Sequence, residues 1–356
     1  MGLNREIAAL RLSAQRIAEP DFTSAGDVVR WMFAMQAQDF PGVKWSVGLR
    51  FPGSTDAAVE RAIASRELVR SWPMRGTLHL IAGEDLGWTL ALTGPRLVQG
   101  TTTRRAQLGI SNEDLVVVRS VAEQALAGGT LERGELLAAF ERAGQPTGAQ
   151  RGYHLLLHLA ITRVIVFGPV AGKQHTFALL DEWVPNARAL DREESLGEFA
   201  LRYFTSHGPA TERDFAWWAS LTLTEARTAI AVAGVRLERR EIDGIVYRLA
   251  HGLEPARDAV HLLPGFDEFL LGYQDRSAAL PQEYADRIVP GNNGVFQPTI
   301  VSNGRVVGTW RRTEKAKAVL VEPQSFDVPT KKTTAGVASA ATRYGRFLQK
   351  PVSVPG

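Results

Sequence analysis

The sequence predicts a mostly α-helical chain with small β-hairpins, an α+β fold in which three tandem winged-helix motifs precede a small mixed α/β region. Two observations predict it. The order helix, helix, helix, hairpin occurs three times, and this pattern changes after about residue 258. We therefore expect four segments, over residues 1–100, 111–181, 193–251 and 258–356.

The first segment begins with a helix over residues 3–17. Ser24 predicts the start of a second helix, because Asp27 lies three residues further on, as in a capping box. We expect Pro41 to end this helix, since the residue before a proline avoids the helical conformation. A third helix and a two-stranded hairpin complete the winged-helix order, over residues 56–65, 68–72 and 77–81.

The second segment repeats this order. Glycine breaks and capping residues predict helices over 112–127 and 131–143 and a third helix that Thr147 caps and that reaches residue 161. The hairpin that follows has strands over 164–167 and 176–180, joined across Gly168-Pro169 and Gly172-Lys173.

The third segment shows the order again. Thr211 caps its middle helix, and Asp243-Gly244 turns its hairpin. The elements are helices over 194–206, 211–219 and 223–233 and strands over 235–241 and 245–249. Residues 130–133 and 210–213 match weakly, which duplication and shared capping explain equally well.

The last segment, residues 258–356, has a different pattern. Asn303-Gly304 lies between apolar runs over 296–301 and 305–310, which is the strongest short signal for a hairpin. A further strand over 319–321 and a closing helix over 334–348 follow. We therefore expect a small mixed α/β region here.

Composition narrows the class of protein. The chain has 356 residues and a formal net charge of +3, which permits nucleic-acid binding without requiring it. It contains no cysteine, so disulfides, thiolate nucleophiles and thiolate zinc sites are excluded. It has no apolar run of about 18 residues and no signal-peptide core near its start. We expect a monomeric cytoplasmic protein.

Three short segments carry a resemblance to a known family. They are Met35-Gln36-Ala37-Gln38, Arg75-Gly76-Thr77-Leu78-His79, and Leu263-Pro264-Gly265-Phe266-Asp267-Glu268 followed by Thr309-Trp310-Arg311-Arg312. With the order of elements along nearly the whole chain, they resemble the AlkZ-like (AlkZ/YcaQ superfamily) winged-helix DNA glycosylases. The Gln-x-Gln pattern places the chain beside the AlkZ-like branch, since the YcaQ-like branch carries Gln-x-Asp.

The resemblance implies a fold, an activity and a partner. The fold is a C-shaped scaffold of three winged helices around double-stranded DNA, with a DNA-contacting hairpin in the last segment. The activity is hydrolysis of the N-glycosidic bond of bulky, cationic N7-alkylated purines, serving self-resistance to a DNA-alkylating natural product or crosslink repair. Gln36 and Gln38 are then the catalytic residues.

The chemistry of two amides fits that activity. A cationic base is already a good leaving group, so no general acid is needed, and two glutamine carbonyls can position a water. Residues two apart do not share a face of a regular helix, so Gln36 and Gln38 converge only where the helix ends, which Pro41 and Gly42 favour. Without the resemblance, two solvent-facing glutamines explain the pattern as well. No lysine lies in the segment, so we expect no lyase activity.

Several neighbouring residues are further candidates, some with more than one interpretation. Asp39 is either a general base or a support of the turn after the helix. Arg75 and His79 are supporting residues, and His79 either contacts DNA, orients a catalytic group or is an ordinary buried histidine. His154 and His158 have i,i+4 spacing, but no HExxH carboxylate accompanies them, so we expect no metal, and no cofactor either.

Arginines provide the predicted DNA contacts. Arg104 and Arg105 follow three threonines in an expected linker. Arg151 and Arg163 flank the third helix of the second segment. Arg311 and Arg312 close the late hairpin. Trp217 and Trp218 belong to the core or stack on bases. Two other functions remain open, a non-catalytic winged-helix DNA-binding regulator and a scaffold that binds protein partners.

Overall fold

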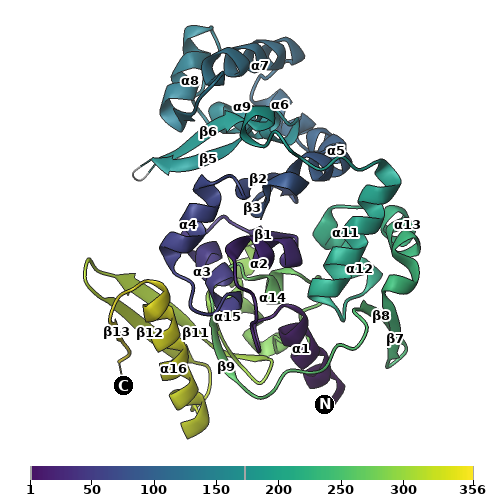
Figure 1. Ribbon diagram of the computed structural model, residues 1–356, viewed down its shortest axis with the longest axis vertical. Coiled ribbons are helices and arrows are strands. Elements are labelled where there is room, and N and C mark those ends of the chain that lie inside the picture. The colour runs from purple at the N-terminus through teal and green to yellow at the C-terminus, as the bar shows by residue number, and fades with distance from the viewer. Residues whose placement is uncertain (1, 172–173, 356) are drawn as a thin grey trace. The chain divides into compact units, whose positions relative to one another are not determined.

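The computed structural model describes residues 2–171 and 174–355 and has mixed helices and strands throughout (Figure 1). It divides into two compact units: Met1–Val59 with Leu196–Gly356, and Glu60–Ser195. The Gly172-Lys173 part of the expected second turn lies outside the described residues. Within the described part of the chain, none of the helices combines the length and apolar character that a membrane crossing requires.

The unit Glu60–Ser195 is built on an antiparallel sheet whose strands run in the order β3-β2-β5-β6-β4. The strands are β2 (Leu68–Met74), β3 (Thr77–Ala82), β4 (Leu131–Glu132), β5 (Ile165–Ala171) and β6 (Gln174–Leu179). The helices are α4 (Asp56–Ala64, which begins before the unit boundary), α5 (Gly83–Gly100), α6 (Thr102–Gln107), α7 (Asn112–Leu126), α8 (Arg133–Arg142), α9 (Arg151–Ile161) and α10 (Leu180–Trp183). Leu155, Phe140 and Phe177 are central to its core.

The other unit begins with α1 (Gly2–Ala14), α2 (Ala25–Met32), β1 (Ala34–Gln36) and α3 (Phe40–Arg50). It resumes with α11 (Arg192–His207, which begins before the boundary), α12 (Glu212–Ala219), α13 (Leu223–Ala233), a 3₁₀ turn (Gly234–Arg236) and the hairpin β7 (Glu238–Ile242) and β8 (Ile245–Leu249).

A second sheet of this unit has the strand order β13-β12-β11-β10-β9. Its strands are β9 (Val260–Leu263), β10 (Thr299–Ser302), β11 (Arg305–Glu314), β12 (Val319–Ser325) and β13 (Val352–Ser353). The helical pieces are α14 (Glu268–Leu271), η2 (Gln282–Tyr284), α15 (Ala285–Ile288), η3 (Pro290–Asn292) and α16 (Lys331–Phe347), and α16 packs against β9 (Figure 1).

Local sequence signals place most of these boundaries. Ser24 accepts a hydrogen bond from the Asp27 backbone N–H at 3.0 Å, and Thr211 forms a capping box with Asp214. Asn303 and Gly304 both have positive φ, as a tight two-residue hairpin requires. These expectations are confirmed.

Other expectations about helices are wrong. Met35–Gln38 does not end a helix, because α2 stops at Met32 and Gln36 closes β1. Pro41 lies in the first turn of α3, where its missing N–H costs nothing. Thr147 does not cap α9, which follows Gln150 in the left-handed conformation.

Candidate active site

A strained turn precedes the short strand that ends in Gln36, the first residue of the Gln-x-Gln motif. Phe33, the residue after α2, has φ 66° and ψ −58°, a γ-turn conformation that is rare for a bulky side chain. Its ring is fully buried against Phe199, with ring centroids 4.8 Å apart, and against Trp218 at 6.2 Å. Packing thus holds the turn, and the chain leaves it as β1, ending at Gln36.

The two amides of the motif meet. The Nε2 of Gln36 donates to the Oε1 of Gln38 at 2.5 Å. Gln36 is only 7% exposed, whereas Gln38 is exposed. Within the described residues, the Oε1 of Gln36 is buried and accepts no hydrogen bond. Because a buried carbonyl without a donor is costly, this oxygen is suited to accept a hydrogen bond from a bound molecule.

Asp39, the candidate base, is engaged in an ion pair. Both of its carboxylate oxygens lie 3.0 Å from Nη2 of Arg312 on β11. Asp39 precedes α3 but makes no side-chain capping bond to it. Its carboxylate packs over Gly42, where a Cβ would collide with it. Arg312, predicted to contact DNA, is therefore the ion-pair partner of the residue that follows the motif.

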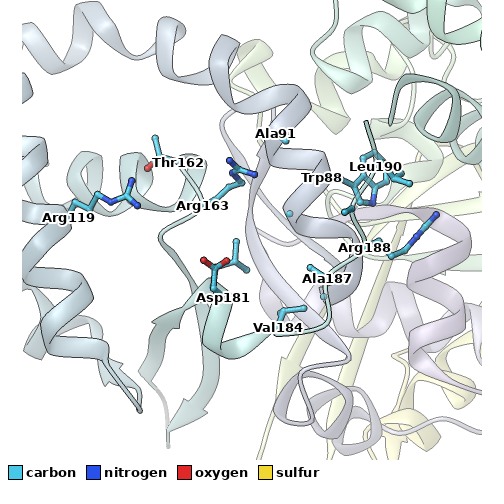
Figure 2. A pocket seen from close by; sticks show the side chains of 14 residues that line it. Trp88, Ala91, Arg119, Thr162, Arg163, Asp181, Val184, Ala187, Arg188 and Leu190 are labelled. Carbon is cyan, nitrogen blue, oxygen red and sulfur yellow. The ribbon is translucent and has the colours of Figure 1, made fainter. Parts of the chain in front are cut away.

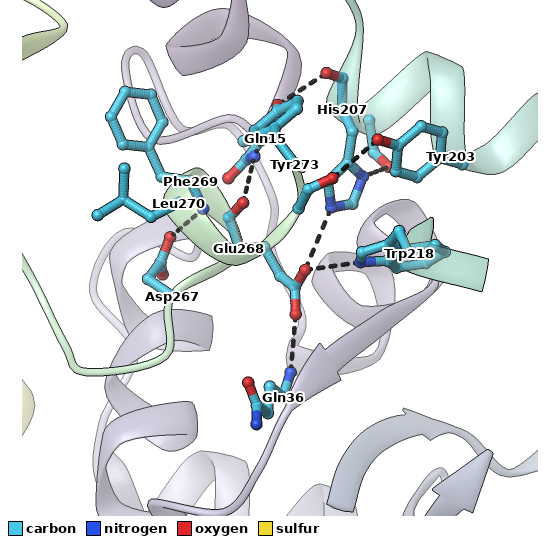
Figure 3. Close-up of polar contacts among 12 residues, drawn as sticks. Gln15, Gln36, Tyr203, His207, Trp218, Asp267, Glu268, Phe269, Leu270 and Tyr273 are labelled. Carbon is cyan, nitrogen blue, oxygen red and sulfur yellow. Dashed lines mark hydrogen bonds and ion pairs between the residues drawn. The ribbon is translucent and has the colours of Figure 1, made fainter. Parts of the chain in front are cut away.

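Asp267 and Glu268 are consecutive carboxyl groups on the segment after β9, and Figure 3 shows that Glu268 contacts Gln36 of the motif. Glu268 is 1% exposed, and its Oε1 accepts the backbone N–H of Gln36 at 3.0 Å. Its Oε2 accepts the indole N–H of Trp218 at 2.8 Å and lies 3.6 Å from Nε2 of His207. The site is thus tied to the segment after β9.

Asp267 binds a different partner. The fully buried guanidinium of Arg50, on α3, donates to both Asp267 oxygens at 3.1 and 3.2 Å. It also donates to the side-chain Oε1 of Gln15 and to the backbone oxygen of Ser46. This buried ion pair fixes α3 to the same segment that carries Glu268.

Arg75 and His79 belong to the unit Glu60–Ser195. Nδ1 of His79 lies 2.9 Å from the backbone oxygen of Thr77, so Nδ1 carries the proton and Nε2 is left to accept from Arg75 at 2.9 Å. His79 is fully buried. It therefore orients Arg75 within this unit.

The arginines predicted to bind DNA differ in how many partners they have within the protein. Arg104 and Arg105 lie on helix α6, so the prediction that they lie in an irregular linker is wrong. Arg104 is exposed and donates to Gln150 at 2.8 Å. Arg151 donates to oxygens of Leu108, Gly109, Asp114 and Gln145, and so connects α9 to α7 and its preceding loop.

Arg163 and Arg311 are exposed. Arg163 lines a pocket of about 490 Å³ with Arg119 and Asp181 (Figure 2). Arg188, also at this pocket, forms an ion pair with the buried Asp85 at 2.9 Å. The pocket presents charged side chains of both signs, and the Gln-x-Gln motif does not line it.

The remaining predicted residues have structural surroundings. Burial lowers the pKa of His158 to about 4, with a further contribution from Arg105, and lowers that of His154. Among the described residues, no three His, Cys, Asp or Glu side chains gather as a metal site. Trp218 is fully buried in the core, whereas Trp217 is half-buried beside Arg276.

Sequence reasoning missed Glu268 as part of this site. The signal was present, because Asp267-Glu268 puts two charges directly after the apolar run ending in Phe266. Charges in such a position need partners when they are buried. Trp218 lies 50 residues from Glu268, but the partners in the first part of the chain are more than 200 residues away, at Arg50 for Asp267 (a separation of 217) and at Gln36 for Glu268 (a separation of 232).

Comparison with known proteins identifies the class. A family model described as DNA glycosylase AlkZ-like matches residues 29–347. A curated relative from Streptomyces sahachiroi, named interstrand DNA cross-link repair glycosylase, is 29% identical over 363 residues, 96% of each chain. The solved structure of Streptomyces sahachiroi DNA glycosylase AlkZ matches with a TM-score of 0.82 and 24% identity over 99% of each chain. The protein is a DNA glycosylase in class. It belongs to the AlkZ-like family.

Proposed function

We propose that this protein is a monofunctional glycosylase that hydrolyses the N-glycosidic bond of bulky, cationic N7-alkylated purines in double-stranded DNA. Gln36 and Gln38 are its catalytic residues. The observation that carries the proposal is the buried Oε1 of Gln36, which lacks a hydrogen-bond donor within the described residues and lies beside the exposed Gln38.

The two amides act on a water molecule. Oε1 of Gln36 accepts one hydrogen of the water, and the second lone pair of Gln38 Oε1 accepts the other. The oxygen of the water then faces the anomeric carbon. As the C–N bond breaks, its electron pair goes to the base and neutralises the cationic purine. The water oxygen bonds to the anomeric carbon and its surplus proton passes to solvent, leaving an abasic site.

This chemistry restricts the substrate. Neither glutamine is a useful base or acid at neutral pH, so the amides contribute position and oriented dipoles. Unmodified bases, which need protonation to leave, are poor substrates. Lys44 is the lysine nearest in sequence to the motif, and its ammonium is paired with Asp56 at 2.7 Å, which favours hydrolysis without strand cleavage.

The scaffold and biological role extend the proposal. We assign three winged-helix motifs to residues 1–100, 111–181 and 193–251, followed by the mixed region 258–356, with Arg104, Arg105, Arg163 and Arg311 contacting phosphates. The name of the Streptomyces sahachiroi relative refers to interstrand cross-link repair. We propose that this protein likewise unhooks interstrand crosslinks, or protects its host against a compound that forms them.

Single-turnover base release tests the assignment. With enzyme in excess over a duplex carrying an N7-alkylguanine, Gln36→Ala and Gln38→Ala should each slow release by roughly 10- to 1000-fold, as for other preorganised hydrogen-bonding groups. The double variant should be little slower than the slower single variant, because the two amides hold one water. Gln38→Asp should retain activity, since it recreates the Gln-x-Asp pattern of the sister branch.

Affinity and substrate series complete the test. DNA affinity should stay nearly unchanged in each alanine variant. Duplexes with N7-alkyl groups of increasing size should all be processed by the wild type, whereas an unmodified duplex should not. Wild-type rates in both alanine variants would remove the glutamines from the mechanism.

A further inference from the structure

We propose that Glu268 is a positioning residue for base release, because its carboxylate holds the backbone of Gln36 and so fixes the direction of the Gln36 amide. This inference rests on the proposed role of Gln36. It assigns a function to the buried Glu268, which the hydrolytic step itself does not use.

The contact between Glu268 and the motif is direct. The hydrogen bond from the Gln36 N–H to Oε1 of Glu268, at 3.0 Å, is buried and joins residues 232 positions apart (Figure 3). A hydrogen bond that is buried from water is electrostatically stronger than one in water. Since Gln36 is the last residue of a strand of three residues, this bond fixes the backbone from which the catalytic side chain extends.

Glu268 is itself held firmly. The indole N–H of Trp218 donates to its Oε2, and its backbone oxygen accepts from Nε2 of Gln15 at 3.1 Å and from the N–H of Gly272 at 2.8 Å. His207 lies beside Oε2 and stacks on Tyr203 with centroids 4.9 Å apart. The carboxylate therefore has little freedom to move and can serve as a fixed reference for the strand.

The strained turn before β1 explains why such a restraint is useful. Phe33 occupies a conformation that is costly for a bulky side chain and persists only where the surroundings impose it. Its ring packs on Trp218, the same residue that donates to Glu268. Trp218 and Glu268 therefore restrain the two ends of the segment from Phe33 to Gln36.

Direct contact of Glu268 with DNA does not fit the geometry. The side chain is 1% exposed, and each of its oxygens accepts a hydrogen bond from the protein. It therefore acts through Gln36. A misplacement of about 1 Å can cost about 100-fold in rate, so loss of this restraint is expected to slow the chemistry while leaving DNA binding intact.

Glu268→Gln is the main test. The carboxamide keeps the shape but turns one of its two acceptors into a donor, so it cannot accept from both Gln36 and Trp218. We expect single-turnover release of an N7-alkylguanine to slow by about 10- to 100-fold. The Kd for the same duplex should change by less than about threefold, because phosphate contacts dominate affinity.

Asp85→Asn is the matched control. Asp85 is fully buried in the other unit and accepts an indole N–H from Trp88 at 2.9 Å, as Glu268 does from Trp218. Its substitution removes the charge of a buried carboxylate, which also pairs with Arg188 at 2.9 Å, without touching the motif. Release per folded molecule should stay near the wild-type rate.

The Gln36→Ala background separates positioning from a general structural effect. If Glu268 acts through Gln36, then Glu268→Gln should slow Gln36→Ala no further, whereas a structural defect would reduce the two rates by the same factor. Trp218→Phe, which keeps an aromatic ring and the Glu268 carboxylate but removes the indole N–H donor, should show a smaller slowing with the same dependence on Gln36. It also serves if Glu268→Gln does not fold.

The outcomes distinguish this inference from the proposed function. A wild-type rate for Gln36→Ala would overturn the proposed site, and the inference with it. A slow Gln36→Ala together with a wild-type rate for folded Glu268→Gln or Trp218→Phe, or with full additivity, would overturn the positioning role alone.

Discussion

Replacing Asp39 decides between its two roles, a general base and a structural partner of Arg312. The Asp39 and Arg312 side chains are 28% and 19% exposed, and both carboxylate oxygens lie 3.0 Å from the same guanidinium nitrogen. A fully exposed ion pair contributes about 0–1 kcal/mol, whereas a hydrogen bond to a charged group contributes about 1.5–3 kcal/mol. For this partly exposed pair, we expect Asp39→Ala to lower the free energy of unfolding by about 1–2 kcal/mol.

Base release should respond differently. Because the Asp39 carboxylate is paired with Arg312, we expect the rate of single-turnover base release per folded Asp39→Ala molecule to stay within about threefold of wild type. Removal of a general base would instead slow release by about 100-fold or more. Urea unfolding of Asp39→Ala, Arg312→Ala and the double variant gives the coupling energy, which should be about 1 kcal/mol. The two single variants should have similar stability.

Asp56→Ala provides a control. Asp56 forms a partly exposed ion pair with Lys44 in the same unit, so its loss should cost similar stability without affecting the rate. An inactive Asp39→Ala beside an active Arg312→Ala and an active Asp56→Ala would show that the carboxylate does chemistry, and would refute the structural assignment.

Three further predictions concern stability and DNA binding. Asp267→Asn leaves the buried Arg50 guanidinium without its counterion and should lower the free energy of unfolding by about 3–5 kcal/mol in urea. The Ser111 backbone N–H and then Arg151 lower the pKa of Asp114 from 3.8 to about 2, so its stabilisation is present above about pH 4 and lost as the pH falls toward 2. The difference in unfolding free energy between wild type and Asp114→Asn should follow that profile. Arg311→Ala should flatten the salt dependence of DNA affinity by about one unit, while fluorescence anisotropy with an unchanged slope would remove Arg311 from the interface.

Local signals in the sequence predicted many elements because their cause is local. Ser24 and Thr211 cap their helices through side chains three residues from their partners, and Asn303-Gly304 adopts positive φ whatever lies elsewhere in the chain. Such features depend on a few neighbouring residues. The hairpin at Asp243-Gly244 followed for the same reason.

The geometry around the motif could not be predicted in this way. The sequence shows Pro41 as a helix stop, but proline also suits the first turn of a helix, and only the tertiary structure selects between them. A phenylalanine does not signal a positive φ in the sequence. At Phe33 the positive φ is imposed by the packing of its buried aromatic ring. Arg312 lies 273 residues from its partner Asp39, and Glu268 lies 232 residues from Gln36, whose backbone N–H it accepts.

The carboxylates around the motif bear on the choice of chemistry. Asp39 binds Arg312, Asp267 binds Arg50, and Glu268 accepts from Gln36 and Trp218. Each of these three carboxyl groups thus has a partner within the protein, while the side chains of the motif itself are neutral amides. In the proposed function, the neutral amides orient a water molecule but cannot donate a proton to the leaving group. Under the proposed function, this arrangement is the reason to expect a preference for a base that already carries positive charge over the unmodified bases that surround every lesion, because the described residues of the motif supply no acid.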